Sequence, residues 1–109
     1  MNSKEYSVEI LEPAQNELEN IALLHKTLVG PISARRITDK IYNSLERLAD
    51  NPFIGPVLND PDLADADYRF VVADVYLAVY RIIESRVVIY HIFDGRTNYP
   101  STFKREINE

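Results

Sequence analysis

The residues best suited to chemistry lie in a short polar stretch just beyond the last predicted strand. Arg96, Asn98 and Tyr99 follow the strand-breaking pair Asp94-Gly95. An arginine guanidinium can hold a phosphate or a carboxylate through two hydrogen bonds, and segments beyond the ends of strands often carry function. We therefore expect Arg96 and Tyr99 to contact a substrate or a partner. The alternative is that Tyr99 packs over the end of the sheet.

Metal and thiol chemistry are not expected in this chain. There is no cysteine, which excludes thiol nucleophiles, disulfides and zinc–thiolate sites. The two histidines, His25 and His91, fall on different predicted elements, and His91 lies among apolar strand residues where a structural histidine is common. The stretch 59–67 holds four aspartates but lacks the glycine and the bidentate glutamate of an EF-hand loop. We predict no metal and no cofactor.

The charge of the chain limits its partners. The formal net charge is −5 and the pI is near 5.0, which counts against broad nucleic-acid binding. Basic residues nevertheless outnumber acidic ones after residue 67, so a locally basic sheet surface remains compatible with the sequence. No apolar run approaches the roughly 20 residues of a membrane span, and the N-terminus has no apolar signal core. We expect a cytoplasmic protein without membrane association.

Two amphipathic helices must help to position these residues. In the first, apolar-stripe positions recur three or four residues apart: Ala14, Leu18, Ile21, His25 and Leu28. The second has a stripe of the same kind: Ala34, Ile37, Ile41, Leu45 and Leu48. Because only Gly30-Pro31 separates the helices, and Pro13 and Pro52 bound them, we predict an antiparallel helical hairpin.

One strand precedes the predicted helices and three follow them. Residues 6–10 alternate apolar and polar side chains, as in a half-buried strand. Segments 68–73, 76–84 and 86–93 are rich in Val, Ile and Tyr, which favours strands, whereas 51–67 is rich in Pro and Asp and predicts a loop.

This element order predicts one α+β domain over residues 1–109. It consists of an N-terminal strand, a two-helix hairpin, a three-stranded antiparallel meander and a short C-terminal helix or tail. The strands form one small twisted sheet with the helices on one face and the other face more open.

The hairpin between the last two strands predicts which side chains share a face. A two-residue turn at Glu84-Ser85 pairs Ile83 with Arg86. The predicted core face then contains Tyr76, Ala78, Tyr80, Ile82, Val87, Ile89, His91 and Phe93. The predicted open face contains Leu77, Val79, Arg81, Ile83, Arg86, Val88, Tyr90 and Ile92.

The chain resembles the RelE/ParE superfamily of bacterial type II toxins, most closely the ParE-like branch. The resemblance covers nearly the whole chain and is carried by YSVEI, PAQNELENIALL, SARRITDKIYNSLERLADNPFIGPVL, YRFVVADVYLAVYRI and VVIYHIFDGR. The most specific pieces are NPFIGPVL, the YR that opens the second strand and the GR after the last strand. The fold that the resemblance implies is the fold predicted above.

The resemblance implies one of two activities. RelE-like toxins cut messenger RNA on the ribosome without a metal, whereas ParE-like toxins inhibit DNA gyrase. In the nuclease interpretation Arg69, Arg96 and Tyr99 would be catalytic. Leu77 stands where the nucleases carry an arginine, and leucine neither binds phosphate nor transfers a proton, so the ParE-like interpretation is preferred. A member that binds its antitoxin without being toxic is a further alternative.

The resemblance also implies the partners and the binding residues. We expect a cognate antitoxin protein, DNA gyrase or the ribosome as the target, and a hetero-oligomeric toxin–antitoxin complex. The residues expected to bind the target or the antitoxin are Leu77, Arg81, Tyr90, Arg96 and Tyr99. For Arg81 the sequence alone favours a structural role, in which it pairs with Glu84 or lies over Tyr90, over contact with a target.

Overall fold

The structure is a computed structural model that describes residues 6–58, 60 and 66–97. Tyr99, the expected C-terminal helix and most of the aspartate-rich stretch lie outside the described residues, so the expectations about them stay predictions. No helix in the described ranges is long and apolar enough to cross a membrane.

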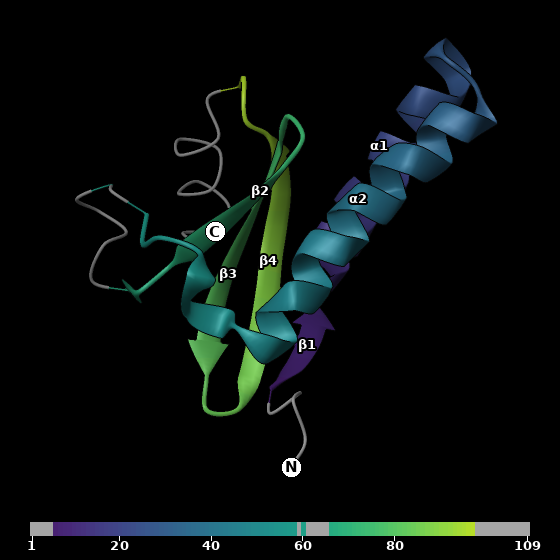
Figure 1. The fold of residues 1–109 in the computed structure, drawn as a ribbon. Helices are drawn as coiled ribbons and strands as arrows, with labels where there is room; N and C mark the ends of the chain where they lie inside the picture. The colour runs from purple at the N-terminus through teal and green to yellow at the C-terminus, as the bar shows by residue number, and fades with distance from the viewer. Residues whose placement is uncertain (1–5, 59, 61–65, 98–109) are drawn as a thin grey trace.

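Two helices form the predicted hairpin (Figure 1). Helix α1 spans Glu12–Leu28 and helix α2 spans Pro31–Asp50, each with a proline in its first turn, where the missing N–H costs nothing. Gly30, with φ of 128°, makes the sharp connection between them. The predicted stripes are buried along most of their length, but the α1 stripe becomes exposed towards Leu28.

The four strands form one sheet in the order β1-β4-β3-β2. Strand β1 (Ser7–Ile10) pairs in parallel with β4 (Arg86–Asp94), whereas β3 (Tyr76–Ile83) is antiparallel to both β4 and β2 (Arg69–Ala73). The helices cover one face of this sheet, and their connected ends extend past it (Figure 1). This arrangement confirms the predicted α+β fold.

A β-bulge changes the predicted faces of β4. The turn pairs Ile83 with Arg86 as expected, but the register shifts beyond Tyr80, so that Tyr80 pairs with Ile89 while Val79 pairs with His91. Tyr90 is the extra residue, and every later side chain changes sides. Ile92 therefore joins the core beneath the helices, and the prediction that placed Phe93 there was wrong.

The second face of the sheet is covered rather than open, which corrects a second expectation. A 3₁₀ turn at Pro52–Ile54 leads into a segment that runs along the edge of β2 and places Leu58 on this face. The segment pairs with β2 through the bridge of Val57 to Arg69. The resulting small core contains Leu58, Tyr68, Leu77, Val79 and Phe93, all buried. Apolar side chains on this face thus pack against the chain's own loop.

Candidate functional site

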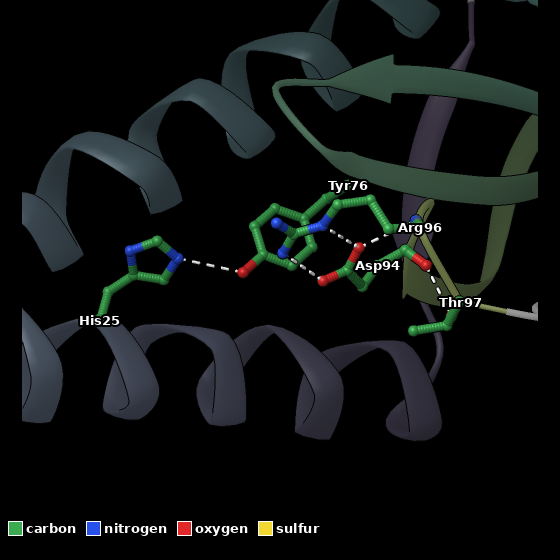
Figure 2. Close-up of polar contacts among 5 residues, drawn as sticks. All are labelled: His25, Tyr76, Asp94, Arg96 and Thr97. Carbon is green, nitrogen blue, oxygen red and sulfur yellow. Dashed lines mark hydrogen bonds and ion pairs between the residues drawn. The ribbon is translucent and has the colours of Figure 1, made fainter.

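A cluster of polar side chains gathers at one end of the sheet (Figure 2). Tyr76 begins β3 and lies opposite Asp94 at the end of β4. The Tyr76 hydroxyl shares a hydrogen bond of 3.0 Å with Nε2 of His25 on α1. Arg96 turns back onto Asp94, donating to Oδ1 from Nε at 2.9 Å and to Oδ2 from Nη2 at 2.6 Å. Arg96, which was expected to be functional, therefore lies beside Tyr76 and Asp94, and neither was predicted to act with it.

The cluster contains two shifted ionisation equilibria. Hydrogen bonds from the Arg96 side chain and backbone N–H lower the pKa of Asp94 to about 2. Burial, with the nearby Asp94 carboxylate as a smaller cause, raises the pKa of Tyr76. At neutral pH the site thus holds an ionised Asp94–Arg96 pair beside a protonated tyrosine hydroxyl.

This cluster adjoins an exposed apolar surface at the connected ends of the helices. The apolar hairpin end, as we call it, comprises Leu23, Leu24, Leu28, Val29 and Ile32, which are 51–76% exposed. A surface pocket of ≈ 180 Å³ lies between the two features and is lined by Leu24, His25, Leu28, Val29, Tyr76 and Arg96. Apolar contact with an adjacent cation and polar groups is an arrangement that suits protein recognition.

Arg69, the other expected catalytic residue, has a structural position. Its guanidinium donates to the Gly55 carbonyl oxygen at 2.8 Å and lies 5.1 Å from the centre of the Phe53 ring. Arg69 pairs with Tyr80, whereas the Arg96 cluster is anchored at Tyr76. These anchors are four residues apart on β3, roughly 13 Å. The structure therefore does not bring the two arginines to one site.

The expected binding residues Arg81 and Tyr90 meet around Tyr68. The Arg81 guanidinium lies 5.3 Å from the centre of the Tyr68 ring, and the Tyr68 and Tyr90 rings pack edge to face at 5.4 Å. Burial raises the pKa of Tyr68. Leu77 is only 7% exposed and lies in the core of this face. Its side chain supports the surface rather than forming it.

Sequence reasoning missed His25, Tyr76 and Tyr68. A signal for His25 was its position as the one polar residue in the α1 apolar stripe. Tyr76 begins a core-facing strand and Tyr68 precedes Arg69, but neither position indicates a partner. Their contacts join segments up to 51 residues apart, so they depend on how the helices and loop pack on the sheet.

Comparison with known proteins decides the family. Residues 8–99 match the model of the ParE toxin of the type II toxin–antitoxin system parDE. The chain belongs to the ParE toxin family. It is accordingly the toxin component of a type II module, which confirms the resemblance deduced from the sequence. A search of curated proteins returns no match.

Solved structures share the ParE toxin fold. A chain of the chromosomal ParDE toxin–antitoxin system of P. aeruginosa superposes with a TM-score of 0.69 at 18% identity, covering 84% of this chain and 97% of that one. A chain of the RelBE2 toxin–antitoxin complex of Mycobacterium tuberculosis gives 0.62 at 20% identity, covering 83% and 98%. At these identities the likeness shows the fold alone.

Proposed function

We propose that this ParE-family toxin arrests growth by binding DNA gyrase, not by cutting RNA. The observation that carries the proposal is the state of the expected nuclease residues. Arg69 is engaged with Gly55 and Phe53, Arg96 is paired with Asp94, and the position of the nuclease arginine is a buried leucine, Leu77. Phosphate stabilisation and proton transfer in RNA cleavage need clustered, available groups. A cytoplasmic location is part of this proposal, because gyrase acts there.

An antitoxin is proposed to dock on the apolar hairpin end. Exposed apolar side chains concentrated on one projecting end are what an amphipathic helix buries when it binds. Arg96, at the adjoining pocket, would then be the charged contact at the rim. Arg81 and Tyr90 remain proposed contacts for gyrase on the opposite face of the sheet. The proposed binding roles of Leu77 and Tyr99 are kept, with Leu77 acting through the packing beneath that face.

The target is tested by producing the toxin alone in a bacterial host and following DNA and protein synthesis by short pulse labelling. We expect DNA synthesis to fail first, and purified toxin to inhibit supercoiling by purified gyrase. Earlier failure of translation, with ribosome-dependent cleavage of a defined message, would contradict the proposal in favour of the nuclease. An absence of any growth defect would indicate a member that binds its antitoxin without being toxic.

The docking surface is tested with two matched substitutions. Leu28→Ser removes an exposed apolar side chain from the hairpin end, and Val72→Ser removes one from β2, where Val72 is 57% exposed. We expect Leu28→Ser to weaken antitoxin binding at least tenfold and Val72→Ser to leave it unchanged, as measured by calorimetric titration. Equal effects would contradict docking at the hairpin end.

A further inference from the structure

A stripe of hydrogen-bond donors runs along one side of α2. We call it the donor stripe, and it consists of Ser33, Arg36, Lys40, Asn43, Ser44 and Arg47. Successive members are three or four residues apart, with Asn43 and Ser44 sharing one step, so they lie on one face of the helix. Three members carry positive charge and none is acidic. The stripe borders the buried face of α2 and is at least partly exposed throughout.

The donor stripe lines two pockets that follow one another along α2. The first, of ≈ 470 Å³, includes Ser33, Arg36, Lys40 and Asn43, with Ile37 as its apolar part. The second, of ≈ 150 Å³, includes Ser44 and Arg47 and is closed on the other side by β2 and the segment at Gly55. The stripe is therefore one wall of a shallow depression, not a convex surface.

The cations of the donor stripe are available. Neither Arg36 nor Arg47 forms an ion pair with any residue that the structure describes, and Lys40 reaches Asp74 only at 3.5 Å. Both partners of that pair are about half exposed, so it contributes little stability and can be exchanged for another anion. Asp39 and Asp74 also line the first pocket, which limits its positive potential and predicts weak binding of anions.

The spacing of the donors suits a chain of phosphates. Fourteen residues of helix separate Ser33 from Arg47, which is about 21 Å, a length of duplex axis along which each strand carries about six phosphates. Arg, Lys, Ser and Asn are the side chains that donate to phosphate oxygens in nucleic-acid complexes. We propose that the donor stripe of α2 binds the phosphodiester backbone of DNA, independently of base sequence.

This inference goes beyond the proposed function, because it concerns direct contact between the toxin and DNA without gyrase. A net charge of −5 does not prevent this contact, because only one helix face takes part. With three cations engaged, log K should fall with log salt concentration with a slope of about −2.7. Binding should be measurable at low salt and lost near physiological salt.

The test is fluorescence anisotropy of a labelled DNA duplex of about 20 base pairs, titrated with the purified full-length toxin between about 50 and 200 mM salt. We expect Arg36→Gln or Arg47→Gln to weaken binding severalfold and to reduce the salt slope by about 0.9 each. Arg35→Gln is the matched control, because Arg35 is an exposed arginine that neighbours Arg36 in sequence but points to a different side of the helix; it should change neither quantity. Asp74→Asn should strengthen binding.

Three results would overturn the inference. The first is no binding at the lowest salt, and the second is an equal loss with Arg35→Gln and Arg36→Gln, which would indicate diffuse electrostatic attraction. The third is displacement of the DNA by polyglutamate or by inorganic phosphate at equal charge concentration, which would assign the stripe to an acidic protein segment or to a single anion. Because all these side chains are exposed, thermal melts of the variants should match the parent and separate binding from folding.

Discussion

At the scale of the residue, Tyr80 shows how one buried hydroxyl holds a loop against a sheet. Its side chain is fully buried, and the hydroxyl donates to the Pro52 carbonyl oxygen at 2.7 Å while accepting from the Gly55 N–H at 3.1 Å. Burial raises the pKa of Tyr80, so the hydroxyl stays protonated and able to donate. Gly55 fits here because a Cβ would overlap the Phe70 carbonyl oxygen and the Tyr80 hydroxyl.

Replacing Tyr80 by phenylalanine should destabilise the fold by about 1–3 kcal/mol, because a buried N–H and a buried carbonyl lose their partner. The measurement is the free energy of unfolding in urea. Tyr42→Phe is the control, since Tyr42 is 39% exposed and should change stability little. A cost for Tyr80→Phe no larger than for Tyr42→Phe would show that water replaces the hydroxyl.

Asp94 should give the chain an acid-sensitive contribution to stability. Its folded pKa of about 2 lies below the ordinary value of 3.8 because Arg96 stabilises the carboxylate. A depressed folded pKa stabilises the protein above about pH 4, and that contribution is lost as the pH falls from about 4 to about 2. An NMR titration of the Asp94 carboxyl should show the low pKa, and Arg96→Gln should return it towards the ordinary value.

At the scale of the element, β4 illustrates how a helix can stabilise an irregular strand. The pairing of β4 with β1 ends at Ile89. Beyond it, the carboxylate of Glu17 on α1 replaces β1 as the hydrogen-bond partner of this edge of β4. It accepts from the Ile92 N–H at 2.8 Å and lies 3.2 Å from Nδ1 of the buried His91. The bulge and this carboxylate together orient the end of β4, and thereby Asp94 and Arg96.

Replacing Glu17 by alanine should cost about 1–3 kcal/mol, because it leaves the Ile92 N–H and the His91 ring without this acceptor. Amide hydrogen exchange at Ile92 should become faster than at Val87, which lies where β1 still pairs with β4. Glu19→Ala is the matched control, since Glu19 is an exposed glutamate of the same helix. Unchanged exchange at Ile92 would contradict a role for Glu17 in holding this edge.

The elements themselves were largely predictable from the sequence, whereas the bulge was not. Periods of two and of three to four residues identify strands and helix stripes, because each element buries one face. A bulge depends on how two strands and the helix beside them fit together, so no local pattern revealed that Phe93 would lie on the face away from the helices. The same limit applied to the site: Arg96 was predicted from its place after β4, but its neighbours His25 and Tyr76 were not.

At the scale of the whole molecule, the helical hairpin has two different parts. Its inner part packs on the sheet through residues such as Ile41 and Leu45, each 1% exposed. Its connected ends extend past the sheet (Figure 1), which leaves the apolar hairpin end without a covering layer among the described residues. Folding and the proposed antitoxin docking thus use separate lengths of the same two helices.

This division predicts that stability and binding separate on mutation. Ile41→Ala should cost about 2–5 kcal/mol through the cavity it leaves, whereas Leu28→Ser should change the free energy of unfolding by less than about 0.5 kcal/mol. Urea unfolding of the isolated toxin measures both. A large loss of stability from Leu28→Ser would mean that the hairpin end is part of the core, and would contradict its proposed role in docking.

The sequence by itself determined the class of fold, the hairpin register at Glu84-Ser85 and the toxin family, because periodicity, turn residues and motif order are local properties. Only the tertiary structure decided that Leu77 is buried, that Arg69 holds a loop, and that Arg96 lies beside Tyr76 and Asp94. Those outcomes depend on which segments cover each face of the sheet. They also depend on a bulge in β4 that moves the side chains after it to the opposite face. Both are set by packing between residues distant in the chain.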